Sequence, residues 1–209
     1  MKRFVVSSVV VVLLAIALPM SATIIPPFTP SPGLAPTPVG SIPAGTQIDT
    51  TGAVFFHFGT SADPNKNTGF VEEDVYRDNS GFLFFVFQIQ VLTGDIKTIS
   101  SGDWDNSIII DAQMTANGGN LIPQGVDRNG LGTVGINFNP LVLPGDTSYA
   151  VILYTNSTTV LPGGIGLIDT GSSPTIPGFV AGPVATPEPA TLSLLAAGLL
   201  GLGSLRKRR

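Results

Sequence analysis

The chain has 209 residues, a formal net charge of −4 and no cysteine, which excludes disulfides and thiolate metal sites. Residues 45–170 hold thirteen acidic and four basic residues, a net charge of −9. Phosphate groups would repel so acidic a segment, so we expect no nucleic-acid partner.

Residues 1–22 have the pattern of a secretory signal peptide. Two basic residues, Lys2 and Arg3, precede an apolar run over 4–18, and small residues follow up to Ala22. The pattern predicts export through the inner membrane with cleavage after Ala22. An uncleaved signal anchor is the alternative, because Met20 departs from the small residue usual three positions before the cut.

Two segments with little charge are predicted to flank the folded domain. Residues 23–44 contain seven prolines and no charged residue, which predicts an extended linker that packs no core. Residues 171–185 are rich in Ser, Pro and Gly, which predicts a flexible stalk. The folded passenger domain is therefore predicted over 45–170, an ordinary size for one domain.

Alternating apolar residues separated by turn signals predict an all-β passenger. In the strongest strand, 82–92, Leu83, Phe85, Phe87, Ile89 and Val91 share one wholly apolar face, while the other face becomes polar at Gln88 and Gln90. Further strands are predicted over 53–58, 74–77, 96–100, 107–114, 133–138, 148–155 and 164–169. Short strands with Gly- and Pro-rich turns favour an antiparallel β-sandwich, flanked here by an N-terminal signal helix and a C-terminal transmembrane helix.

The C-terminal segment, 186–209, combines three parts in a fixed order. A Pro187-Glu188-Pro189 triplet is followed by the uncharged apolar run 190–205 and by the basic cluster Arg206, Lys207, Arg208 and Arg209. As a helix, the apolar run would rise about 24 Å, slightly less than the ~30 Å hydrocarbon core of a bilayer. The basic cluster would stay on the cytoplasmic side. An ordinary membrane anchor is the alternative, but an anchor does not need the triplet.

This order of parts resembles the PEP-CTERM sorting tail of Gram-negative bacteria. The resemblance implies recognition by a membrane-embedded exosortase, which cleaves near the triplet. It also implies transient membrane anchoring after export, followed by release to the cell surface or the medium. Residues 75–77, 127–132 and 143–148 resemble other passengers of this family, which supports a β-rich fold and implies no activity.

Two motifs in the passenger suggest catalytic or nucleotide-binding chemistry only weakly. Gly130, Gly132 and Gly135 spell G-x-G-x-x-G, but a dinucleotide site requires a helix after the motif, and a strand is predicted there. A turn before a glycine-rich strand is the preferred interpretation. His57 is the only histidine, and it alternates with phenylalanines on a predicted strand. It is therefore interpreted as a residue on a sheet face.

Carboxylates are the remaining candidates for chemistry. Glu72, Glu73 and Asp74 are predicted to lie together before a strand, and Asp103, Asp105 and Asn106 surround Trp104. Loop oxygens of this kind bind calcium, but the spacing does not match an EF-hand, so solvated acids are the preferred interpretation and no cofactor or metal is predicted. Glycoside hydrolysis would need two carboxylates across a cleft, which a sequence cannot show.

Three functions remain open for the passenger. The preferred prediction is a non-catalytic protein of the envelope or of an extracellular polysaccharide matrix such as a biofilm. The alternative is a carbohydrate-binding module or adhesin, with Trp104 as the platform that stacks on sugar rings. A tryptophan packed against the sandwich edge is the simpler interpretation of Trp104. A glycan-active enzyme is the third and most distant possibility.

Overall fold

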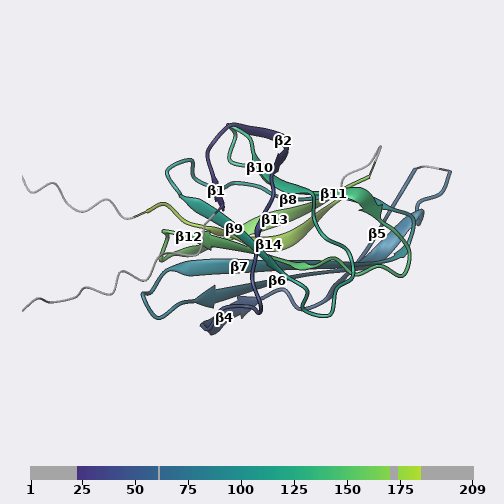
Figure 1. Cartoon of the computed structure of the whole chain (residues 1–209). Coiled ribbons are helices and arrows are strands. Elements are labelled where there is room, and N and C mark those ends of the chain that lie inside the picture. Colours follow the sequence, from purple (N-terminus) through teal and green to yellow (C-terminus); the bar gives the residue numbers. More distant parts are fainter. Residues whose placement is uncertain (1–22, 61, 170–173, 185–209) are drawn as a thin grey trace, which may run out of the picture.

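The structure is a computed structural model that describes residues 23–60, 62–169 and 174–184, and within them it forms two packed β-sheets (Figure 1). The first sheet runs in the order β1 (Thr23–Ile25), β9 (Ile110–Thr115), β12 (Ala150–Thr155), β7 (Leu83–Thr93), β6 (Asn67–Arg77) and β4 (Thr46–Thr50), with β3 (Thr37–Pro38) beside β9 and β5 (Val54–Phe58) beside β6. The second runs in the order β14 (Thr175–Ala181), β13 (Val160–Ile168), β8 (Ile96–Ser101), β11 (Val134–Val142), β10 (Gly125–Arg128) and β2 (Thr29–Leu34).

The strand pairing confirms the predicted all-β, antiparallel sandwich. All pairs of strands in the described residues are antiparallel except β3 with β9, which is parallel. No described residue is helical. The predicted signal helix within 1–22 and the predicted transmembrane helix within 186–209 lie outside the described residues.

The inner face of β7 forms the centre of the core, as its alternation predicts. The five apolar residues on that face are all at most 1% exposed: Leu83, Phe85, Phe87, Ile89 and Val91. They pack with inward residues of the second sheet, including Ile99, Ile136 and Leu167. Burial of alternate residues between two sheets is what makes this arrangement stable.

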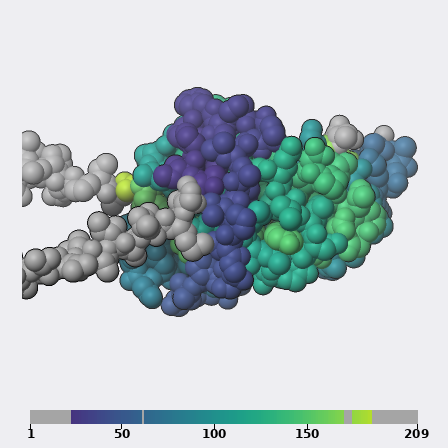
Figure 2. Space-filling model, viewed as in Figure 1, coloured from purple at the N-terminus to yellow at the C-terminus, as the bar shows by residue number. Residues whose placement is uncertain are grey.

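A smaller apolar cluster lies on the outer face of the first sheet. Phe84 and Val86 of β7 pack there with Ala150 and Ile152 of β12. Val39 and Ile42 of the proline-rich segment cover them, and the Val39 N–H donates to the Met114 carbonyl at 2.8 Å. Figure 2 shows this N-terminal segment, in purple, lying across the body of the molecule.

The prediction that 23–44 is an unpacked linker is therefore wrong. The segment contributes β1 and β3 to one sheet and β2 to the other, and Ile25 is 1% exposed in the core. Proline is tolerated in β2 because this edge strand pairs only with β10, so one side of its backbone needs no N–H donor.

The predicted stalk, 171–185, is also wrong where the structure describes it. Thr175–Ala181 forms β14, which pairs with β13 along its whole length, and Val180 is buried. Residues 171–173 and 185 lie outside the described residues. The folded domain thus extends to Ala181, which leaves few residues between it and the triplet at Pro187.

Other strand bounds differ from the prediction in detail. β6 begins at Asn67 rather than 74, β9 begins at Ile110 rather than 107, and β11 continues to Val142. Neither β4 nor β10 is predicted, because both are short and carry little apolar alternation. The domain predicted over 45–170 is therefore extended at both ends.

Candidate functional site

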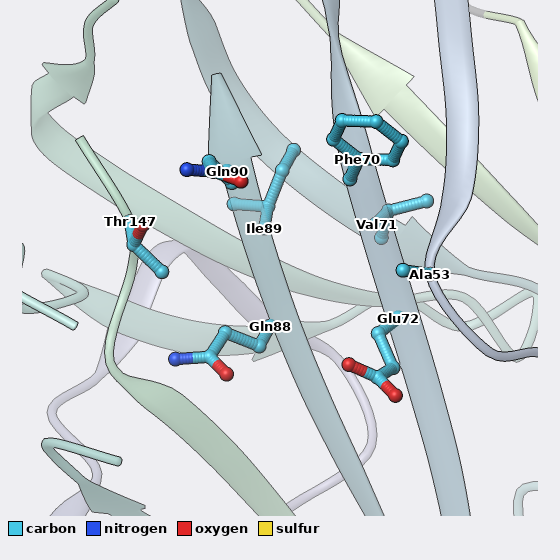
Figure 3. Close-up of a pocket in the computed structure, with 8 residues that line it drawn as sticks. All are labelled: Ala53, Phe70, Val71, Glu72, Gln88, Ile89, Gln90 and Thr147. Atoms are coloured by element: carbon cyan, nitrogen blue, oxygen red, sulfur yellow. The ribbon is translucent and has the colours of Figure 1, made fainter. Parts of the chain in front are cut away.

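A shallow groove lies on the outer face of the first sheet, where β6 and β7 run side by side. Strand alternation points Phe70 and Glu72 outward from β6, and Gln88 and Gln90 outward from β7. With Ala53, Val71, Ile89 and Thr147, these residues line a space of about 280 Å³ (Figure 3). The groove is thus formed by outward side chains above the sheet backbone.

Strand register places Phe55 of β5, which lies beside the groove, in a row with three of the side chains that line it. Phe55 of β5 lies opposite Phe70, Phe70 opposite Gln90, and Gln90 opposite Thr147. The rings of Phe55 and Phe70 meet edge to face with their centroids 5.4 Å apart, and Phe55 remains 52% exposed. One end of the row is therefore aromatic, and the other is polar.

Several polar groups in the groove have no partner within the described chain. The side chains of Glu72, Gln90 and Thr147 make no hydrogen bond there, whereas Gln88 donates through Nε2 to the carbonyls of Asn117 and Ser148 at 3.1 and 2.9 Å. Burial first, and then the nearby Asp74 carboxylate, raise the pKa of Glu72. The groove therefore combines one fixed amide with three free polar groups.

Trp104 is buried, so the prediction that it forms an exposed sugar platform is wrong. It is 2% exposed, its ring meets that of Phe85 edge to face at 4.9 Å, and its Nε1 donates to Ser101 Oγ at 2.8 Å. Asp103, just before it, has a positive φ of 67°, and the Trp104 N–H donates to the Gly132 carbonyl at 2.8 Å. The simpler interpretation, a packed tryptophan, is confirmed.

The three carboxylates predicted to lie together before a strand instead lie within β6 and point to opposite faces. Glu72 and Asp74 point outward, whereas Glu73 points into the core and is 0% exposed. The Phe179 N–H donates to Glu73 Oε2 at 2.8 Å, while Oε1 is buried without a partner. This separation is inconsistent with a shared cation site, and β6 presents no carboxylate pair across a cleft.

The polar side chains around Trp104 make hydrogen bonds that hold the local loop together. The Ser107 N–H donates to Asp105 Oδ1 at 2.7 Å, which is the main reason why the pKa of Asp105 is lowered. The Asn106 side chain donates to the Gly130 carbonyl at 3.0 Å. Among the residues that the structure describes, no group of three His, Cys, Asp or Glu side chains could hold a metal ion.

The glycine motif forms a turn before a strand, and His57 lies on a sheet face, as the sequence predicts. Gly132, with φ of 79°, forms a turn that receives the Trp104 N–H on its carbonyl at 2.8 Å, and β11 follows the turn. A strand in the place of a helix rules out a dinucleotide fingerprint at this position. His57 is exposed on β5 beside Phe55, with the two rings stacked 6.3 Å apart.

Sequence reasoning missed one feature of the site, the groove, and two of the core, the buried charged residues Glu73 and Arg128. The groove depends on the register of β5, β6 and β7, which no local pattern specifies. Glu73 and Arg128 are fully buried, although charged residues are usually exposed. Arg128 donates to the carbonyls of Ile108 and Asp105 at 2.6 and 2.5 Å, and burial lowers its pKa.

The C-terminal residues lie outside the described part of the chain, but they match a family model. The model of the PEP-CTERM protein-sorting motif matches residues 185–209. The chain carries a PEP-CTERM protein-sorting motif. The match includes the triplet Pro187-Glu188-Pro189 and the basic cluster Arg206–Arg209, so the resemblance seen in the sequence is confirmed.

The PEP-CTERM motif implies export and recognition by an exosortase. No curated protein and no solved structure matches the chain. Among residues 23–60, 62–169 and 174–184 no helix is long and apolar enough to cross a membrane. The match to known proteins therefore covers the tail and none of the residues of the sandwich.

Proposed function

We propose that this protein is exported, cleaved by an exosortase near Pro189 and released to the cell surface or the extracellular matrix, where its sandwich acts without catalysis. The observation that carries the proposal is the PEP-CTERM motif at residues 185–209. The signal-peptide pattern of residues 1–22 is consistent with it, because a sorting tail acts only on a chain that enters the export pathway.

The geometry of the sandwich supports a binding or structural role. Glu72 and Glu73, the adjacent glutamates of β6, lie on opposite faces of the first sheet, and Arg128 donates to two backbone carbonyls. Glu73 and Arg128 are both 0% exposed, so neither side chain is open to a substrate. A carbohydrate-binding role is the second candidate, and the groove over β6 and β7 is the observation that favours it.

Processing is expected to remove the end of the chain. Protein recovered from the cell surface or medium should lack the segment after about Pro189, and intact-mass measurement will show this directly. Glu188→Ala should leave full-length protein in the membrane fraction, because it removes the only charge of the triplet. A surface protein whose mass includes Ala190–Arg209 would contradict the proposal.

The matched control for this experiment is Pro183→Ala. Pro183 lies just before the matched residues, within the described chain, and it is not part of the triplet. The variant should be processed like the unmodified protein. In a host without the exosortase, the unmodified protein and Pro183→Ala should both stay full-length in the membrane fraction, like Glu188→Ala.

A further inference from the structure

We propose that the groove over β6 and β7 binds a neutral polysaccharide chain, with Phe55 and Phe70 stacking on sugar rings and Glu72, Gln90 and Thr147 binding hydroxyl groups. The inference rests on the export proposed above, which would place the groove among extracellular polymers. Polysaccharide binding is thereby assigned to the outer face of the first sheet and not to Trp104.

The aromatic end of the groove suits the apolar face of a sugar ring. A pyranose presents C–H groups on its faces and hydroxyls around its rim, so it needs an exposed aromatic surface with polar groups at the side. Phe55 supplies an exposed ring, and its edge-to-face contact with Phe70 at 5.4 Å holds that ring in place. A preorganised platform loses little side-chain freedom on binding.

The polar end of the groove suits the rim hydroxyls. The Gln90 amide both donates and accepts, the Glu72 carboxylate accepts, and the Thr147 hydroxyl does both. Within the described residues these three side chains have no hydrogen-bond partner, while Gln88 is already fixed to Asn117 and Ser148. The unpartnered groups are therefore available to a ligand that carries many hydroxyls.

The dimensions of the groove indicate a chain that crosses the sheet. The row Phe55, Phe70, Gln90 and Thr147 spans three inter-strand spacings of about 4.8 Å, or ~14 Å in all. The space of about 280 Å³ in the groove is smaller than that of a pocket that encloses a whole ligand, typically ~300–1,000 Å³. An open row of this length suits consecutive units of a polymer.

The charge of the site selects the class of polymer. No lysine or arginine lines the groove, Glu72 lies within it, and Asp74 is the next outward residue on β6. Uronate-rich, sulfated and nucleic-acid polymers would be repelled by these carboxylates. A peptide strand would need an open sheet edge for backbone pairing, and the groove lies on a sheet face. A neutral glycan satisfies each of these conditions.

Affinity electrophoresis tests the proposal with full-length protein in a detergent that has no sugar headgroup. Native gels would contain hydroxyethyl cellulose, dextran or, as the polyanion, alginate. We expect slower migration in at least one neutral gel and none in alginate. Phe55→Ala and Gln90→Ala should each weaken the retardation about fivefold or more, the scale of one lost stacking or polar contact.

The control variant is Phe82→Ala, which removes an exposed phenylalanine beside the far end of the same β7 strand. It should migrate like the unmodified protein in every gel. Circular dichroism will verify that each variant is folded, and both groove residues are exposed, so truncation should leave the core intact.

Three outcomes would overturn the proposal: no retardation in either neutral gel, retardation confined to alginate, or equal retardation of the unmodified protein and both groove variants. These results would leave the processing proposal untouched, because intact mass tests that proposal separately. Loss of retardation in both groove variants but not in Phe82→Ala would support the groove.

Discussion

The free energy of unfolding of the unmodified protein is expected to fall as the pH rises from about 5 to 8. Glu73→Gln is expected to abolish this fall. The Glu73 side chain lies between the sheets, and burial is the main cause that raises its pKa from 4.5 to about 8. The Phe179 N–H opposes this shift, while Asp74 and Asp49 add to it. The folded protein therefore holds a proton on Glu73 at pH values at which the unfolded chain has released it.

The sign of the effect follows from this difference in proton binding. Between pH 4.5 and about 8 the folded state binds more protons than the unfolded state, so the free energy of unfolding falls as the pH rises. The slope is at most ~1.4 kcal/mol per pH unit, and the whole change is on the order of 4 kcal/mol. Glutamine does not titrate, so the variant should lack this component.

Urea unfolding at pH 5, 6, 7 and 8 will measure the effect, with Glu72→Gln as the matched control. Glu72 is the neighbouring residue, but it lies on the outer face, where solvent screens its charge. The control should therefore retain most of the pH dependence of the unmodified protein. Parallel stability curves for Glu73→Gln and the unmodified protein would show that Glu73 is ionised in the fold.

Phe85→Ala is expected to lower the free energy of unfolding by about 3 to 5 kcal/mol, the usual cost of removing a buried aromatic side chain. Phe85 is 0% exposed, lies opposite Val75 and Leu153 on the neighbouring strands, and contacts the Trp104 ring. The cavity would therefore open in the centre of the core, where several rigid neighbours cannot collapse into it.

The midpoint of urea unfolding will measure this loss, and Phe82→Ala is again the control. Phe82 is 41% exposed, so its truncation should cost less than about 1 kcal/mol. If Phe85→Ala unfolds at the same urea concentration as the unmodified protein, the assigned packing of β7 is incorrect.

The sequence predicted the parts of the fold that depend on local alternation. The apolar face of β7 was recognised because its five inward residues repeat every second position, and that period is a property of any strand. Edge strands were missed for the opposite reason. β2 contains Pro30 and Pro32, and β14 contains Pro177, so composition favoured loops. Each pairs on one side only, so a missing N–H is tolerated on the open side.

The candidate site could not be predicted, because it depends on the register between strands that are distant in the sequence. Phe55 and Gln90 are separated by 35 positions, and only the register of β5, β6 and β7 brings them into one row. Trp104 was misplaced because its neighbours in the sequence are polar, whereas its ring packs on Phe85 of β7, which is distant in the sequence. The tail, by contrast, is a linear signal, and its order of parts was sufficient to identify it.

The two ends of the sandwich are not equivalent. β7 begins at Leu83, whose N–H donates to the Ser157 carbonyl, and Ser157 Oγ donates to the Gly182 carbonyl just before the tail. Gln90 lies seven residues further along β7, about 23 Å away. In Figure 1 the yellow-green end of β14 and the strand β5 accordingly lie on opposite sides.

This polarity would orient the molecule at a surface. In a chain held by its tail, Gln90 would lie at the end of the sandwich remote from Gly182, which is close to the tail in the sequence. Cleavage would then free the domain without altering the ligand contacts, because the scissile region and the row of Phe55, Phe70, Gln90 and Thr147 share no residue. Anchored and released forms would bind the same polymer with the same intrinsic affinity.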